Sequence, residues 1–179
     1  MRNYLLNNII YCKLDLPKLD LPEVWHTDDI ELKSQKVDGY VSYWLTEEVD
    51  QYVRSLLPAS YFGKPNIPGE IPYAWLIAAT FQGGVSGYIH KDFRKHALNY
   101  VIDPGGDDVI TEFYDDDENL IASYKQEPGE WYFLDSGNYK HCVKGITGKR
   151  TQVSYSIYEE FTEEQWKFIY EKSKSQQTI

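Results

Sequence analysis

Short apolar runs separated by turn-forming residues fill most of the chain between residues 73 and 158. Glycine, proline, asparagine or aspartate stands between most successive runs, as in the segment Asp103-Pro104-Gly105-Gly106-Asp107. Runs of this length with such punctuation are typical of β-strands joined by tight turns. The pattern predicts eight strands, near residues 73–81, 85–92, 96–102, 109–114, 120–125, 130–134, 140–144 and 150–158.

Apolar residues at helical intervals occur on both sides of this strand-rich region. In residues 45–58 they follow Thr46, a good N-cap residue, and Pro58 ends the pattern. The segment Thr162-Glu163-Glu164-Gln165 has the sequence of a capping box. It predicts a second helix that runs to about Lys172, before a polar tail. We expect both helices to pack outside the sheets.

The number and spacing of the predicted strands indicate the fold class. Eight short strands with hairpin signals between them fit a jelly roll, in which two antiparallel sheets form a barrel. We therefore predict a mainly β fold: a double-stranded β-helix barrel of the jelly-roll, cupin-like type, with flanking α-helices.

The first forty residues carry the weakest pattern. They repeat Leu-Asp-Leu-Pro at residues 14–17 and 19–22, and proline favours an extended segment away from the centre of a sheet. We expect a segment that covers or borders the sheet; an arm at the substrate entrance or a dimer contact is the alternative. We predict one domain over residues 1–179: an N-terminal covering segment and helix (1–72), the jelly-roll core (73–158), and a C-terminal helix and tail (159–179).

Composition and charge narrow the function classes. A chain of 179 residues can bury a core without disulfide or metal staples. Its net charge of −10 would repel a phosphate backbone, so nucleic-acid binding is disfavoured. Cys12 and Cys142 form no disulfide framework and indicate a reducing compartment. Since no apolar run has the length of a membrane span or a signal peptide, we expect a cytoplasmic protein without a membrane anchor.

Three residues carry the candidate metal chemistry. In the predicted strand 85–92, His90 and Asp92 lie on the same side, because side chains alternate along a strand, and Lys91 points away. His141 opens a later apolar strand and is the third candidate ligand. Two imidazoles and one carboxylate form the facial triad that suits non-haem Fe(II). Lys91, Arg94 and Lys95 follow closely; we interpret them as a solvated strand end, with a cationic mouth of the site as the alternative.

Polar residues on the last predicted strand suggest a ligand cavity. Arg150, Gln152, Ser154 and Ser156 share one face of that strand. If this face points inward, Arg150 can bind a carboxylate through two parallel hydrogen bonds, which its neighbours complete. A solvent-exposed polar face is the alternative.

The order His90, Asp92, His141 and Arg150 resembles the signature of the Fe(II)/2-oxoglutarate-dependent dioxygenase superfamily, H-x-D, a distal His, and Arg about ten residues further on. The resemblance implies a jelly roll in which His90, Asp92 and His141 are the catalytic iron ligands and Arg150 holds the cosubstrate 2-oxoglutarate. Asn99, Tyr88, Gln152 and Ser154 are further candidate contacts of 2-oxoglutarate. Ascorbate is a candidate accessory reductant.

The same resemblance implies a hydroxylase that consumes O2 and releases succinate and CO2. Asp92 favours hydroxylation, because halogenating members have Gly or Ala at this ligand position. The compact size resembles stand-alone hydroxylases that act on amino acids, peptides, protein side chains or small metabolites. A cupin-like or lectin-like binding module with a structural metal, or none, is the alternative. A metalloenzyme with three or four His ligands is disfavoured, since His26 and His96 lack ligand spacing. The oligomeric state is left open.

Overall fold

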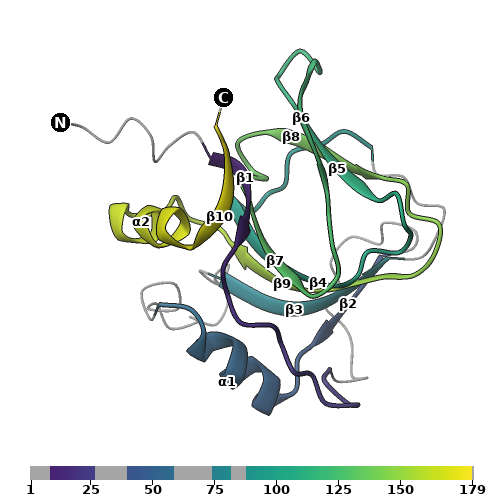
Figure 1. Cartoon of the computed structure of the whole chain (residues 1–179), viewed down its shortest axis with the longest axis vertical. Helices are drawn as coiled ribbons and strands as arrows, with labels where there is room; N and C mark the ends of the chain where they lie inside the picture. The colour runs from purple at the N-terminus through teal and green to yellow at the C-terminus, as the bar shows by residue number, and fades with distance from the viewer. Residues whose placement is uncertain (1–8, 27–39, 59–73, 82–87, 179) are drawn as a thin grey trace.

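Two antiparallel sheets face each other across a barrel in the computed structural model of this chain (Figure 1), which describes residues 9–26, 40–58, 74–81 and 88–178. The larger sheet has the strand order β10-β1-β7-β4-β9-β3-β2, and the smaller one has the order β6-β5-β8. The strands are β1 (Ile9–Leu14), β2 (Tyr40–Trp44), β3 (Ala74–Phe81), β4 (His96–Asp103), β5 (Ile110–Tyr114), β6 (Leu120–Lys125), β7 (Glu130–Leu134), β8 (Lys140–Lys144), β9 (Arg150–Ile157) and β10 (Ser173–Thr178).

The path of the chain between the two sheets defines a jelly roll. It leaves the large sheet after β3, touches the small sheet where His90 bridges to His141, and returns to the large sheet as β4. It then crosses to β5 and β6, back to β7, across to β8, and back to β9. Repeated crossing of this kind between two facing sheets is the jelly-roll arrangement. The predicted mainly β jelly roll with flanking helices is confirmed.

One predicted core strand is not formed by those of its residues that the structure describes. Residues 85–87 of the expected strand 85–92 lie outside the described residues. Of residues 88–92, only His90 makes a bridge, and the chain then bends away from β8. The physical reason is a competing partner: the backbone N–H of Asp92 donates to the carbonyl of Ser136, at 2.9 Å. The other seven predicted strands correspond to β3–β9 within about one residue.

Both ends of the described chain form strands of the large sheet. The sequence predicted a covering segment at the N-terminal end and a polar tail at the C-terminal end. β1 lies between β7 and β10, with Cys12 opposite Phe133 on one side and Gln176 on the other. Five of its six residues are buried, as an internal strand requires. β10 completes the sheet at its edge by backbone pairing, for which a polar sequence carries no hydrophobic signal.

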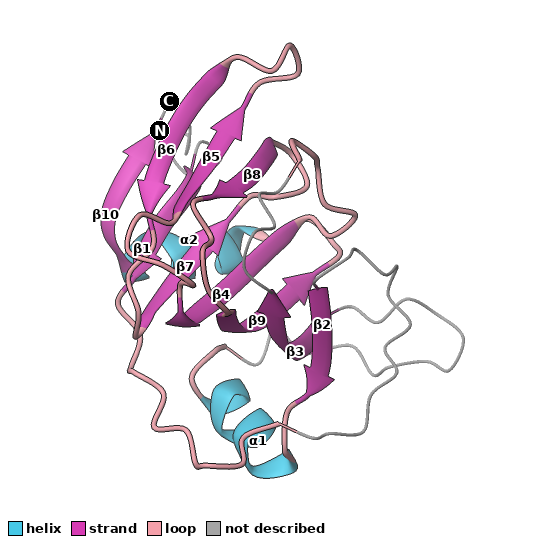
Figure 2. Cartoon of the chain, turned by 90° about the vertical axis from the view of Figure 1, so that its right-hand side faces the viewer, coloured by secondary structure: helices cyan, strands magenta, loops and turns pink. Residues whose placement is uncertain are grey.

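The two helices lie outside the barrel, against the outer face of the large sheet (Figure 2). They are α1 (Glu47–Ser55), preceded by Thr46, and α2 (Glu163–Lys172). The predicted capping box at α2 is formed: Gln165 N–H donates to the Thr162 hydroxyl at 3.3 Å, and Thr162 N–H donates to Gln165 Oε1 at 2.8 Å. Neither helix of the described segments is long and apolar enough to span a membrane.

The alternation of β9 separates two environments. Val153, Tyr155 and Ile157 belong to the outer core, which also contains residues of α1 and α2. The polar residues of the opposite face, Arg150, Gln152, Ser154 and Ser156, are buried as well. The polar stripe therefore points into the barrel and is not a solvent-exposed face.

Candidate metal centre

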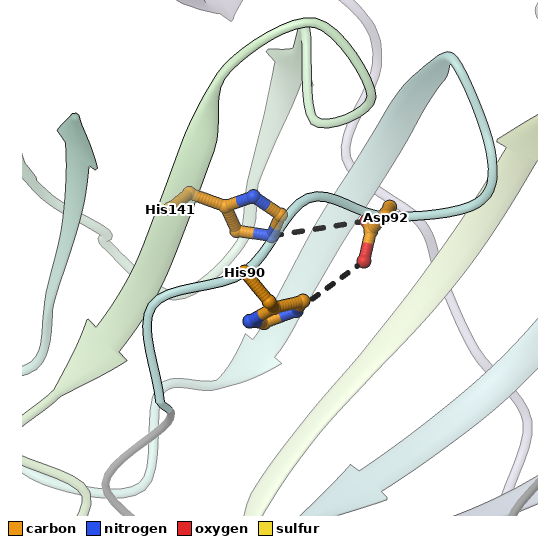
Figure 3. Close-up of side chains that lie close together, drawn as sticks. All are labelled: His90, Asp92 and His141. Atoms are coloured by element: carbon orange, nitrogen blue, oxygen red, sulfur yellow. Dashed lines mark ion pairs between the residues drawn. The ribbon is translucent and has the colours of Figure 1, made fainter. Parts of the chain in front are cut away.

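Three side chains with metal-binding atoms meet between the segment at residue 90 and β8 (Figure 3). His90 Nε2 lies 3.4 Å from Asp92 Oδ1, and His141 Nε2 lies 3.8 Å from Asp92 Oδ2. One atom from each residue can be chosen so that all three lie within 4.8 Å of one another. The structure thus brings together the three residues that the sequence analysis proposed as metal ligands.

Backbone pairing fixes this convergence. His90 N–H donates to His141 O at 3.0 Å, and His141 N–H donates to His90 O at 2.8 Å. This bridge places the two imidazole rings side by side, with centroids 4.5 Å apart. Asp92 reaches them from an irregular segment and not from a continuous strand, because its backbone N–H is hydrogen-bonded to Ser136. The predicted convergence therefore arises by a different geometry from the expected strand alternation.

The histidine tautomers suit metal binding through Nε2. His90 Nδ1 lies 2.7 Å from the carbonyl oxygen of Tyr88, to which it can donate. His141 Nδ1 faces the carbonyl oxygen of Tyr139 at a longer distance, 3.5 Å. A backbone carbonyl that accepts from Nδ1–H leaves the Nε2 lone pair available, which is the usual support for a metal-binding imidazole.

Charge and burial set the protonation of the three side chains. Burial lowers the pKa of His141 to about 4, so this imidazole is neutral at neutral pH. Burial alone would raise the pKa of Asp92, but the charge of Arg94 and the hydrogen bond from His90 hold it well below its usual range. The hydrogen bond to Asp92 raises the pKa of His90. A metal ion at this position would compete mainly with a proton on His90.

Arg94 lies beside the triad, contrary to its interpretation as part of a solvated strand end. Its Nε donates to Asp92 Oδ2 at 2.6 Å, and one Nη donates to the hydroxyls of Ser156 and Ser154, at 2.9 and 3.0 Å. Strand periodicity could not reveal this contact, because the chain bends between Asp92 and β4. Lys91 forms an ion pair with the exposed Asp116 at 2.8 Å and fits the solvated interpretation.

Arg150 is buried deeper along the same interior face of β9. One of its Nη atoms donates to Gln152 Oε1 at 2.9 Å and to Gln126 Oε1. Burial lowers the pKa of Arg150 to about 10, which leaves it cationic at neutral pH. Gln126 was not singled out in the sequence, because it follows β6 in an apparent turn.

The remaining candidate contacts lie at two different depths. Asn99 and Ser154 are buried opposite each other on β4 and β9, and the Ser154 hydroxyl donates to Asn99 Oδ1 at 2.7 Å. Tyr88, expected to face the cavity, is 66% exposed, and its ring lies 4.8 Å from that of His90. Because residue 88 is not part of a strand, alternation does not turn its side chain inward.

Two imidazoles and one carboxylate fit a divalent transition-metal ion. Adjacent ligand atoms on an ion with bonds of about 2.1 Å lie roughly 3 Å apart, so small side-chain shifts would close the observed distances. The other two histidines of the chain do not contribute: His26 bridges to Leu45, and His96 is buried with Nδ1 3.0 Å from Asp135 Oδ1.

No protein-family model and no curated protein sequence matches the chain. Among solved structures, it is similar to a cupin superfamily protein from Desulfitobacterium hafniense, with a TM-score of 0.39 and 12% identity over 79% of this chain and 98% of that one. An oxalate oxidase has a TM-score of 0.36 and 12% identity, over 79% of this chain and 76% of that one. The cysteine peptidase peruvianin-I from Thevetia peruviana latex has a TM-score of 0.36 and 16% identity, over 81% of this chain and 94% of that one. Similarity this distant carries no information on activity, and the jelly-roll assignment rests on the strand order.

Proposed function

We propose that this chain is an Fe(II)- and 2-oxoglutarate-dependent dioxygenase that hydroxylates an amino acid, a peptide or protein side chain, or a small metabolite. The observation that supports the proposal is that the candidate metal ligands and a buried arginine line the same interior of the barrel. The His90, Asp92 and His141 side chains meet at one level of the barrel, and Arg94 links Asp92 to Ser154 and Ser156. The buried Arg150 lies further along the same face of β9.

This arrangement suits a ligand with a metal-binding group at one end and a carboxylate at the other. His90, Asp92 and His141 would hold Fe(II) from one side and leave its other positions open. Bound Fe(II) would supply the oxygen chemistry that couples decarboxylation of 2-oxoglutarate to oxidation of the substrate.

Arg150 would hold the distal carboxylate of 2-oxoglutarate. The planar guanidinium of Arg150 can donate two parallel hydrogen bonds to a carboxylate. A carboxylate is a stronger acceptor than the amide oxygens of Gln126 and Gln152, to which Arg150 donates in this structure. Asn99 already accepts a hydrogen bond at its oxygen from Ser154, so it would offer N–H donors to a ligand. Tyr88, at the surface beside His90, would contact substrate or cosubstrate at the mouth.

Anaerobic titration of the Fe(II)-loaded protein with 2-oxoglutarate tests the proposal. Chelation of the keto acid would produce a weak visible charge-transfer band. We expect the band to be absent in Asp92→Ala. In Arg150→Met, we expect the band to appear only at much higher concentrations of 2-oxoglutarate. Lys149→Ala, which removes an exposed cation next to Arg150, is the matched control and should behave like the wild type.

Each outcome separates the candidate functions. Iron binding without the band would favour the alternative, a metal-binding jelly roll that does not use 2-oxoglutarate. Iron affinity that is unchanged when His90, Asp92 and His141 are each replaced by alanine would refute the metal site itself.

A further inference from the structure

We propose that Arg94 is a positioning residue that holds Asp92 for metal binding through a single carboxylate oxygen. The inference rests on the proposed metal site. Its basis is a set of three contacts from one guanidinium: Nε to Asp92 Oδ2, and one Nη to the hydroxyls of Ser156 and Ser154. The side chains of Arg94 and Asp92 are only 20% and 18% exposed, so these bonds are largely shielded from solvent.

Arg94 Nε engages one of the two carboxylate oxygens of Asp92, Oδ2. Oδ2 lies 2.6 Å from Arg94 Nε, within a strong charge-assisted hydrogen bond. Oδ1 lies 3.4 Å from His90 Nε2, and Oδ2 also faces His141 Nε2, at the longer distance of 3.8 Å. Because the hydrogen bond from Arg94 occupies electron density on Oδ2, Oδ1 is the better donor to a metal ion. One-oxygen binding keeps an additional coordination position open for a chelating cosubstrate.

The guanidinium also connects Asp92 to the strand that carries Arg150. Ser154, which accepts from Arg94, donates in turn to Asn99 Oδ1 at 2.7 Å. A chain of hydrogen bonds therefore runs from the proposed metal ligand across β9 to a residue on β4. The planar donors of arginine suit this bridging, whereas a lysine ammonium on its flexible stem would not span both the carboxylate and the two hydroxyls in the same geometry.

The backbone around Arg94 is fixed independently of its side chain. Lys95 N–H donates to Ile157 O at 2.8 Å, and Gly137 N–H donates to Lys95 O at 2.9 Å. The Lys95 side chain points elsewhere, to Glu160 at 3.1 Å, with 41% and 60% of the two side chains exposed. Lys95 thus provides a matched control at the neighbouring position.

Arg94→Lys tests the inference because it keeps the positive charge and removes the fork. Co(II) would replace iron as the probe, since its visible absorption reports coordination geometry. We expect roughly 10- to 100-fold weaker Co(II) binding and an altered Co(II) spectrum. The double variant Ser154→Ala/Ser156→Ala, which removes the anchors of Arg94 at unchanged charge, should weaken binding in the same direction. Lys95→Arg, the reverse exchange one residue away, should match the wild type.

A purely structural role for Arg94 would lower the thermal stability of the metal-free protein without changing the Co(II) spectrum. Wild-type affinity and spectrum in both Arg94→Lys and the double serine variant would overturn the inference. If Arg94→Lys does not fold, the double variant decides alone. Failure of the wild type to bind Co(II) would overturn the proposed metal site together with this inference, so the two failures are distinguishable.

Discussion

Gly137→Ala should disturb the candidate metal centre although Gly137 has no side chain to contribute. A Cβ atom at this position would lie 2.3 Å from the carbonyl oxygen of Arg94 and 2.7 Å from the Cα of Lys95. Both are backbone atoms of the segment that follows Asp92, so no side-chain rotation can relieve the overlap. Ser136, the residue before Gly137, accepts the hydrogen bond from Asp92 N–H.

The expected size of the effect follows from these distances. Non-bonded heavy atoms rest roughly 3.5 Å apart, so the turn and the segment after Asp92 must separate by about 1 Å. Overpacking of this kind costs about 1–3 kcal/mol. For a chain of this size, that corresponds to a loss of roughly 2–12 °C in Tm. A shift of about 1 Å in Asp92 exceeds the tolerance of roughly 0.5 Å for a preorganised site, and we expect Co(II) affinity to fall about 10- to 100-fold.

Two measurements on the same protein separate stability from positioning. Thermal unfolding of the metal-free variant gives the change in Tm, and anaerobic Co(II) titration gives the change in affinity. Gly148→Ala is the control, because the nearest atom to its Cβ would be Gly105 O at 3.5 Å, an ordinary contact. Gly137→Ala with reduced Tm and wild-type Co(II) affinity would refute the coupling between this turn and Asp92. Wild-type values in both measurements would show that the overlap relaxes without consequence.

Three further predictions address other parts of the molecule. Arg150→Lys should lower the affinity for 2-oxoglutarate roughly 10- to 100-fold in the charge-transfer titration, since one ammonium cannot replace the two-donor fork of the buried guanidinium. An affinity equal to that of the wild type would contradict the proposed role of Arg150. Co(II) affinity should rise with pH by up to about tenfold per pH unit until the raised pKa of His90 is passed, because the metal must displace a proton from His90. His141, with a pKa of about 4, is already neutral and adds no such dependence. An affinity that is constant from about pH 5 to 8 would contradict this assignment. Thr162→Ala should lower stability by about 1 kcal/mol in thermal unfolding by removing the α2 capping box, with Co(II) affinity unchanged; an unaltered Tm would show that the cap is not stabilising.

Local patterns in the sequence predicted most of the barrel. Strands β4–β9 coincide with predicted apolar runs, and each is separated from the next by a segment that contains glycine, proline, asparagine or aspartate; the capping box of α2 forms as expected. Alternation along β9 also separated its polar face from its apolar face correctly. These features depend on neighbouring residues in the chain, whose preferences the sequence expresses directly.

The sequence also identified which side chains could bind a metal, but for a partly wrong reason. His90 and Asp92 were expected to converge by alternation within one strand. They converge because His90 pairs with His141 while Asp92 pairs with Ser136. The spacing of the motif is compatible with both geometries, so the spacing alone could not distinguish them.

The sequence by itself determined the strand-rich core, the two faces of β9 and the candidate ligands His90, Asp92 and His141. Only the tertiary structure decided that β1 and β10 join the large sheet and that Arg94 reaches both Asp92 and Ser154. The physical reason is that strand alternation and helix capping act over a few residues, whereas these contacts join segments far apart in the chain. Backbone pairing between such segments, and the bend that turns Arg94 inward, leave no periodic trace in the order of apolar and polar residues.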